Sequence, residues 1–181
     1  MLGMIKEFAM KTVIYDIYEY FYRAGNVFFE DRIIQSWLKN GEKIPVPHAV
    51  KRQMLQDVVK RNSIKVFVET GTYKGYMIDP LKYIVEKIYS IEIDNFLADK
   101  AQSRFKKNRN ITIINGDSAA EIPDIVKKLE KPALFWLDAH FSGGITGKGD
   151  EDSPLKKELK FIKDNAPAGS IIAIDDIADC N

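Results

Sequence analysis

The sequence predicts an α/β fold in which a parallel β-sheet of about five strands is covered by helices. From about residue 63 onward, short runs of β-branched and aromatic residues alternate with stretches of helical periodicity. Such alternation builds strand–helix–strand units with right-handed crossovers. The runs are apolar throughout, which is typical of strands covered on both faces. The predicted strands are 65–68, 88–92, 111–114, 133–137 and 171–174, and the predicted helices between them are 76–86, 96–107, 119–129 and 154–165.

Length and composition predict one soluble domain that binds a small ligand. The chain has 181 residues, of which 45% are hydrophobic and 29% charged, so it can bury a core. Lys and Arg number 27 and Asp and Glu 26, a balance that lacks the basic excess of nucleic-acid-binding proteins. Cys180 is the only cysteine, which excludes an internal disulfide and a thiolate metal site and fits the cytoplasm. Glu7, Asp16 and Glu19 interrupt the apolar N-terminus, so we expect neither a signal peptide nor a membrane span.

Residues 1–48 are predicted to form a helical extension and linker, followed by the main domain at 49–181. The extension is rich in aromatic side chains interleaved with charges, and Gly25 with Asn26 predicts a break between two helices. We expect its aromatic residues to pack on the main domain or on a second subunit. The alternative is a helix on a membrane surface or over the substrate, although basic residues do not dominate its polar face.

The residues that follow each predicted strand are the candidates for chemistry, because open parallel sheets bind ligands at the carboxyl ends of their strands. Glu69, Thr70 and Gly71 follow the first strand, and Gly75 ends the turn. Gly71 permits a tight turn and close approach of a ligand, and Gly75 permits close packing. Glu69 would repel a pyrophosphate but suits a ligand with sulfonium and ammonium groups, and Tyr73 replaces a glycine of the dinucleotide pattern. A plain strand–helix turn is the alternative.

Acidic and hydroxyl side chains follow the second and third predicted strands. Glu92 lies about twenty residues beyond the glycine turn, the spacing at which a carboxylate meets ribose hydroxyls. A solvated acid is the alternative, and Asp94 is a less favoured ribose ligand. Asp117 and Ser118 follow the third strand, where an adenine would lie. Asp117 could accept from the exocyclic amine while Ser118 caps the next helix, or either residue could act only as a cap.

Three carboxylates gather at the ends of the fourth and fifth predicted strands: Asp138, Asp175 and Asp176. Like charges placed close together destabilise a fold unless a cation joins them. Ligation by oxygen alone suits Mg²⁺ before Mn²⁺ or Ca²⁺. His140 lies two residues beyond Asp138 and is a candidate general base. Capping of the following segment is the alternative for Asp175 and Asp176.

Together these motifs resemble the class I S-adenosylmethionine-dependent methyltransferases. The resemblance covers about residues 66–176 and is carried by Glu69-Thr-Gly71-Thr-Tyr-Lys-Gly75, Glu92, Gly116-Asp117-Ser118, Asp138-Ala-His140 and Asp175-Asp176. The sequence is most similar to the metal-dependent O-methyltransferases that act on sugars of macrolide and aminocoumarin antibiotics, and more distantly to catechol O-methyltransferases. The resemblance implies a Rossmann-like sheet with strand order 3-2-1-4-5.

The resemblance also implies a role for each site residue and a small-molecule acceptor, a sugar or another polar molecule with a hydroxyl group. The cofactor-binding residues would be Glu69, Thr70, Gly71, Gly75, Glu92, Asp117, Ser118 and Asp138. The ligands of Mg²⁺ or Mn²⁺ would be Asp138, Asp175 and Asp176. The catalytic residues would be Asp138 and His140, with His140 as the general base.

Two features depart from the related enzymes. Their sheets end with an antiparallel pair of strands, which this chain lacks, so 171–174 is expected to form an exposed apolar edge. Such edges associate, and we therefore expect a homo-oligomer, formed through this edge or through the N-terminal helices. The loop at 142–152 is also unusually rich in glycine and is expected to be a lid or a flexible connection.

Two other functions are open at this point. A metal-dependent hydrolase would use the acids and the histidine that follow the fourth and fifth strands, but it leaves the glycine turn and Glu92 unexplained. A shortened, non-catalytic domain could bind the cofactor or serve only in assembly.

Overall fold

The computed structural model of the protein describes residue 25, residues 28–138 and residues 154–175. His140, Asp176 and the predicted glycine-rich loop at 142–152 lie outside the described residues. The chain divides into two compact units, Met1–Gln53 and Met54–Asn181. Across the described ranges, no helix combines the length and the apolar character that crossing a membrane requires.

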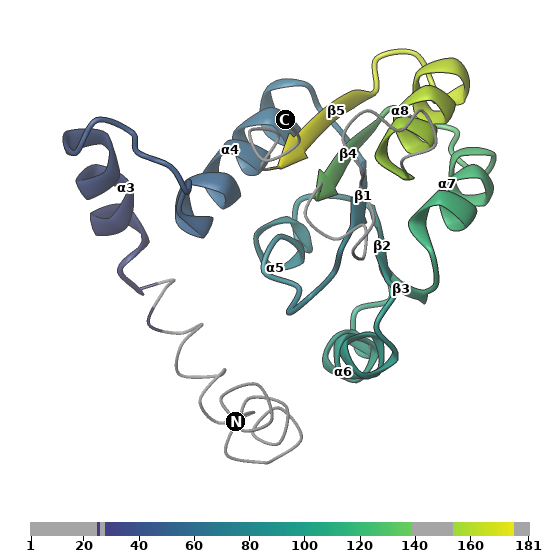
Figure 1. Ribbon diagram of the computed structural model, residues 1–181, viewed down its shortest axis with the longest axis horizontal. Coiled ribbons are helices and arrows are strands. Elements are labelled where there is room, and N and C mark those ends of the chain that lie inside the picture. Colours follow the sequence, from purple (N-terminus) through teal and green to yellow (C-terminus); the bar gives the residue numbers. More distant parts are fainter. Residues whose placement is uncertain (1–24, 26–27, 139–153, 176–181) are drawn as a thin grey trace. The chain divides into compact units, whose positions relative to one another are not determined.

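Five strands form one sheet in the order β3-β2-β1-β4-β5, and each neighbouring pair is parallel (Figure 1). The strands are β1 (Val66–Thr70), β2 (Lys87–Glu92), β3 (Ile111–Asn115), β4 (Ala133–Asp138) and β5 (Ile171–Asp175). The predicted parallel sheet and its strand order are therefore confirmed. Because all strands run the same way, their carboxyl ends lie together at one end of the sheet, which we call its carboxyl edge. Parallel sheets bind ligands there.

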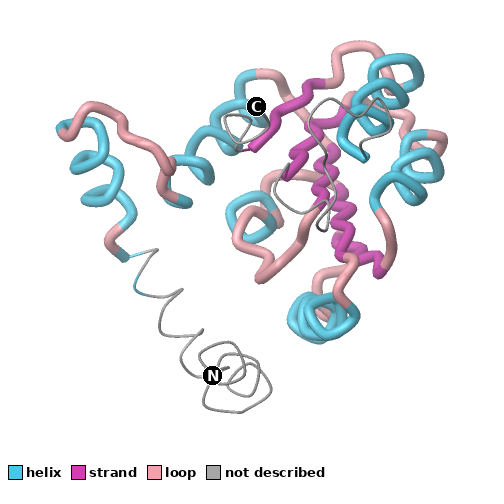
Figure 2. The backbone as a smooth tube through the Cα atoms, in the orientation of Figure 1, coloured by secondary structure: helices cyan, strands magenta, loops and turns pink. Residues whose placement is uncertain are grey.

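Helices cover both faces of the sheet (Figure 2). One face carries the second half of α4 (His48–Arg61), α5 (Ile78–Leu81) and α6 (Asn95–Phe105), and the other carries α7 (Ser118–Val126) and α8 (Pro154–Asn165). Successive β1 side chains point to opposite faces: Phe67 packs with Leu55 of α4, whereas Val68 packs in the core that contains Ile122 of α7. The apolar side chains of the strands thus pack in two cores, one on each face of the sheet.

The segment between β1 and β2 differs from the long helix predicted at 76–86. Only Ile78–Leu81 is an α-helix. The side-chain amide of Asn110 donates to the carbonyl oxygens of Lys82 and Val85, at 2.9 and 3.4 Å. In a longer helix these carbonyls would accept from backbone N–H groups; here the side chain of Asn110, the residue before β3, donates to them instead.

In the first unit, α3 (Glu30–Lys39) precedes the start of α4. The Arg52 guanidinium donates from Nε to Glu30 Oε1 at 2.9 Å and joins the two helices. The Trp37 indole donates to the carbonyl of Lys43 at 2.7 Å, which folds the segment after α3 back on that helix. The boundary predicted before residue 49 stays a prediction.

β5 is an edge strand within the described residues. It pairs with β4, and all five of its residues are half-buried. An edge strand presents backbone N–H and C=O groups that can pair with another chain. Self-association through this edge, like the predicted homo-oligomer, stays a prediction.

Packing on α4 gives a testable difference between neighbouring residues. Leu55 is 2% exposed in the core beneath α4, whereas Met54 is 57% exposed. We expect Leu55→Ala to lower the free energy of unfolding by about 2–5 kcal/mol, because it leaves a cavity against β1. Met54→Ala, on the same helix, should cost less than about 0.5 kcal/mol. Urea unfolding measures both, and equal effects would contradict the assignment of α4 to this core.

Candidate cofactor site at the carboxyl edge of the sheet

A chain of hydrogen bonds holds the buried carboxylate of Glu69 at the end of β1. Glu69 is 2% exposed, and the Ser90 hydroxyl on β2 donates to its Oε2 at 2.6 Å. Thr72 Oγ1 lies 2.6 Å from Ser90 Oγ. Because the single hydroxyl hydrogen of Ser90 goes to Glu69, Thr72 is the donor of that second bond. This chain of hydrogen bonds therefore orients the carboxylate and gives the buried oxygen a partner.

Sequence reasoning missed Ser90 and Thr72. Ser90 is fully buried and lies opposite Glu69 in the register of β1 and β2. A signal was present, since Ser90 is a hydroxyl residue inside an otherwise apolar stretch of the predicted strand. A buried polar side chain needs a partner, and the nearest strand supplies an acid.

The turn after β1 is tight, as predicted from its glycines. The backbone N–H groups of Gly71 and Thr72 both donate to the carbonyl of Ile91, at 2.9 and 3.1 Å. Gly71 has φ +81°, a conformation that glycine adopts without strain. Tyr73 has φ +47° although it carries a side chain. Left-handed backbone at a non-glycine residue costs free energy and is concentrated at binding sites.

Gly75 has the close-packing role predicted for it, and its neighbour is Phe105 of α6. Its φ is +68°, and a Cβ atom there would lie 2.7 Å from the Phe105 ring of α6. The turn therefore needs glycine at this position so that α6 can approach. Contact of Gly75 with a cofactor stays a prediction.

Glu92, at the end of β2, joins the three loops of the candidate site. Its Oε2 accepts from the backbone N–H of Tyr73 at 2.7 Å, and its Oε1 accepts from that of Asp94 at 3.0 Å. Its own carbonyl accepts from Gly116 N at 3.0 Å and from Asn115 Nδ2 at 2.9 Å. Glu92 is 2% exposed, which overturns the alternative of a solvated acid. Each carboxylate oxygen has a second lone pair, so ribose binding remains open to it.

The acids that follow Glu92 and β3 are helix caps. Asp94 accepts from Leu97 N at 2.9 Å and caps α6, so the less favoured ribose ligand has a structural function. Asp117 accepts from Ala119 N at 3.0 Å and caps α7. The cap is therefore Asp117 rather than Ser118, and Ser118 is the first helical residue.

Ser118 instead joins α7 to α8, because its hydroxyl donates to Oε1 of Glu158. Glu158 is 5% exposed. Burial raises the pKa of Glu158, the negative charge of Asp117 raises it further, and the Ser118 hydrogen bond opposes both. Sequence reasoning missed Glu158. The signal was its position within the apolar stripe of α8, between Leu155 and Ile162 at helical spacing.

The predicted metal site lies partly outside the described residues. Asp138 ends β4 and Asp175 ends β5, and the two are register partners in the parallel pair. The sheet thus brings these two of the three predicted ligands to neighbouring strand ends. Asp176 and the predicted base His140 are not described, and the described residues contain no group of three His, Cys, Asp or Glu side chains suited to a metal. The site therefore stays a prediction.

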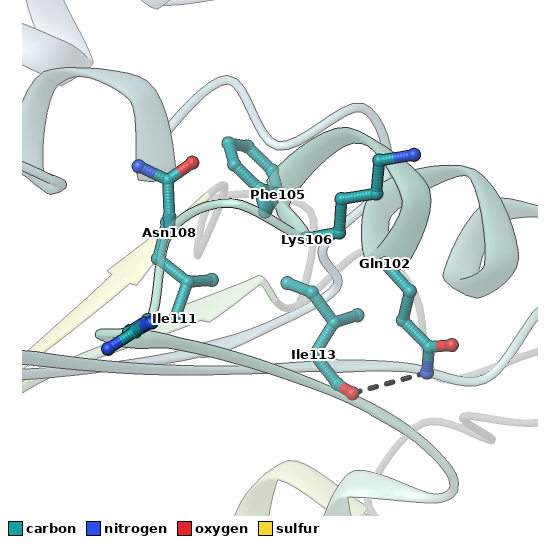
Figure 3. A pocket seen from close by; sticks show the side chains of 7 residues that line it. Gln102, Phe105, Lys106, Asn108, Ile111 and Ile113 are labelled. Carbon is teal, nitrogen blue, oxygen red and sulfur yellow. Dashed lines mark hydrogen bonds between the residues drawn. The ribbon is translucent and has the colours of Figure 1, made fainter.

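A shallow hollow of about 210 Å³ lies elsewhere, between the end of α6 and the start of β3 (Figure 3). Its lining residues are Gln102, Phe105, Lys106, Asn108, Arg109, Ile111 and Ile113. The Gln102 side chain donates to the outward carbonyl of Ile113 at 3.3 Å and so protects this edge strand from pairing. None of the predicted cofactor residues lines the hollow, and no carboxylate does, so it is not the candidate site.

Comparison with known proteins supports the fold. No protein-family model and no curated protein matches the chain. Among solved structures it is similar to the O-methyltransferase TomG from Streptomyces achromogenes, involved in tomaymycin synthesis and in complex with S-adenosylmethionine (SAM). That match has a TM-score of 0.54 and 12% identity, over 80% of this chain and 63% of that one.

Two further structures share the fold. An O-methyltransferase from Bacillus cereus in complex with S-adenosylhomocysteine (SAH) matches with TM-score 0.54 and 17% identity, over 80% of this chain and 64% of that one. An rRNA methylase from Streptococcus thermophilus matches with TM-score 0.51 and 16% identity, over 73% and 72%. The chain spans about two thirds of the length of these structures. It has the fold found in SAM-dependent methyltransferases, which confirms the Rossmann-like prediction.

The raised pKa of Glu158 predicts how stability depends on pH. The folded protein holds a proton on Glu158 up to a higher pH than the unfolded chain, whose value is near the ordinary 4.5. The stabilising effect is therefore complete below 4.5 and is lost as pH rises through the folded pKa. We expect wild type to gain stability relative to Glu158→Gln as pH falls from neutrality toward 4.5.

Urea unfolding of both proteins at a series of pH values measures this difference. Ser118→Ala removes the hydrogen bond that lowers the pKa and should extend the pH-dependent window upward. A difference that is constant with pH, or that grows toward neutrality, would contradict the direction of the shift.

Proposed function

We propose that this domain binds S-adenosylmethionine and transfers its methyl group to a hydroxyl oxygen. The single observation that carries the proposal is the pair of buried carboxylates, Glu69 and Glu92, each 2% exposed at the ends of adjacent strands. Burying a carboxylate is unfavourable unless hydrogen bonds or a cation stabilise it. A ligand with an ammonium group, a sulfonium group and ribose hydroxyls provides both kinds of partner.

The position of each acid supports this ligand over a dinucleotide. Glu69 lies directly before the Gly71 turn, where a dinucleotide would place its pyrophosphate, and its negative charge would repel that group. The ammonium group of the methionine part suits this position. Glu92 lies at the end of the next strand, where the sugar follows, and it can accept hydrogen bonds from two hydroxyls.

In the proposed reaction the cofactor supplies an activated methyl group on sulfur. The sulfur–carbon bond breaks as the carbon–oxygen bond to the acceptor forms, and SAH is the product. Glu69 and Glu92 would fix the donor at its two ends, which holds the methyl group in line with the acceptor oxygen. His140 would take the acceptor's proton, an effect typically of about 10²- to 10⁴-fold.

A divalent metal fits the donor set that follows β4 and β5. Asp138 and Asp175 end adjacent parallel strands, and Asp176 follows directly in the sequence. Carboxylate oxygens suit Mg²⁺ or Mn²⁺. A metal held here would lower the pKa of an acceptor hydroxyl. The proposed acceptor, a sugar or another small polar molecule, rests on the resemblance of the motifs, whereas the proposed cytoplasmic location rests on the single cysteine.

The first test is cofactor binding. We expect SAM or SAH to bind with a micromolar dissociation constant, a free energy of about −8 kcal/mol, measured by calorimetry. Gly71→Val should abolish binding, because Gly71 has φ +81° and a branched side chain would occupy the space beside the turn. The matched control is Gly169→Val, since Gly169 has φ +87° but lies before β5, at the other end of the strands.

Retained folding of both variants is checked by thermal unfolding. Equal loss of affinity in the two variants would indicate general strain rather than a ligand contact. The absence of both a binding heat and a thermal shift in wild type at millimolar ligand would reject the proposed function.

The second test concerns the metal. We expect Mn²⁺ to bind wild type and to bind the double variant Asp175→Asn, Asp176→Asn more weakly, as measured by calorimetry without acceptor or cofactor. The control is the double variant Asp99→Asn, Asp164→Asn, which removes the same charge from two exposed helical positions. Equal affinity in wild type and in the Asp175/Asp176 variant would assign that pair to capping.

A further inference from the structure

The turn after β1 contains three residues with left-handed backbone. Gly71, Tyr73 and Gly75 have φ +81°, +47° and +68°. Glycine adopts this conformation without strain, whereas Tyr73 adopts it at a cost in free energy. Such a conformation persists only where the surrounding contacts enforce it. The contacts around this turn therefore decide whether the candidate site is already formed before a ligand binds.

Helix α6 supplies two of these contacts. The Phe105 ring packs so closely beneath the turn that a Cβ atom on Gly75 would lie 2.7 Å from it. The Arg104 guanidinium donates from Nη1 to the backbone carbonyl of Lys74. Arg104 Cζ also lies 4.6 Å from the centroid of the Phe105 ring. The ring and the guanidinium thus contact two consecutive residues of the turn.

The bond from Arg104 completes a hold on both ends of the dipeptide Tyr73-Lys74. The backbone N–H of Tyr73 donates to Glu92 Oε2 at 2.7 Å, and the carbonyl of Lys74 accepts from Arg104. Glu92 ends β2, and Arg104 belongs to α6. The dipeptide is therefore tied to two different elements, and it cannot rotate without breaking one of the two bonds.

The other terminal nitrogen of Arg104 is fixed by Asp79 of α5. Arg104 Nη2 donates to Asp79 Oδ2, and Lys82 Nζ donates to Asp79 Oδ1 at 3.1 Å. All three side chains are half-buried. One planar guanidinium thus joins α6 both to the turn and to the helix that follows the turn. Arginine can do this because its terminal nitrogens reach separate acceptors, whereas lysine has a single nitrogen.

We propose that Arg104 is a positioning residue that holds the turn after β1 in the conformation that receives the cofactor. The inference rests on the proposed cofactor binding and adds a residue of α6 to it. Arg104 acts through the carbonyl of Lys74. A ligand that binds only the held conformation loses apparent affinity in proportion as that conformation becomes less populated.

The first test is calorimetry with SAH on wild type, Arg104→Ala and Arg104→Lys. We expect both variants to bind SAH about tenfold more weakly or worse, which corresponds to a turn that is in place about a tenth of the time. Arg104→Lys keeps the positive charge, so an arginine that served only as the ion-pair partner of Asp79 would be replaced without loss of affinity. The control is Arg109→Ala, which removes an exposed arginine beyond the end of α6 and should keep the affinity of wild type.

The second test is hydrogen exchange without ligand, which separates a hold on the turn from general stability. The backbone N–H groups of Tyr73 and Gly75 both donate within the site. They should exchange about tenfold faster or more in the two Arg104 variants, whereas the N–H of Val68, within β1, should change much less. A merely structural Arg104 would speed exchange at all three positions alike.

Unchanged exchange at Tyr73 and Gly75 in the folded variants overturns the inference, and so does the wild-type affinity for SAH in both Arg104 variants. Arg104→Lys decides the matter even where Arg104→Ala fails to fold. The two proposals fail in different ways. Failure of the proposed function appears in wild type, as absence of SAH binding, and removes the positioning role with it. Failure of the inference alone appears as equal SAH binding by wild type and the Arg104 variants.

Discussion

The two backbone hydrogen bonds that Glu92 accepts are the constraint on which the rest of the candidate site depends. One comes from Tyr73, in the turn after β1, and the other from Asp94, at the start of α6. The carbonyl of the same residue binds the turn after β3. Three loops that leave three different strands are thus fixed to one residue. The left-handed backbone of Tyr73 is held by this contact, which offsets its conformational cost.

Burial explains why acids can occupy these positions. Glu69 and Glu92 sit among strands that are apolar on both faces, and a bare charge there would be strongly unfavourable. The Ser90 hydroxyl, which itself accepts from Thr72, donates to the carboxylate of Glu69, and backbone N–H groups donate to that of Glu92. Under the proposed function, two carboxylates held at the carboxyl ends of β1 and β2 would favour a cationic ligand over a phosphate.

Sequence analysis predicted the sheet, which depends on the order of apolar runs along the chain. It missed features that depend on contacts between residues far apart in the sequence. Apolar runs separated by helices were enough for the sheet, because handedness rules leave few topologies. The helix predicted between β1 and β2 was too long because Asn110, more than twenty residues away, takes its carbonyls. Glu158 was missed for the same reason: its partner Ser118 lies forty residues earlier, on another helix. Of the two candidate caps, Asp117 caps α7, and the Ser118 hydroxyl bonds to Glu158 instead.

The strand order of the sheet places the candidate cofactor site beside the predicted metal ligands. β1 is central and pairs with β2 on one side and β4 on the other. Thr70, at the end of β1, is the register partner of Leu137, the residue before Asp138. Asp138 therefore lies one strand away from the turn that follows β1. Matching structures keep this sheet, although one is named as an rRNA methylase and another is involved in tomaymycin synthesis. One fold can carry different functions, because function depends on the residues placed on it. Under the proposed function, acceptor choice would depend on the residues around Asp138 and Asp175, and changes there would leave the bonds that Glu92 makes undisturbed.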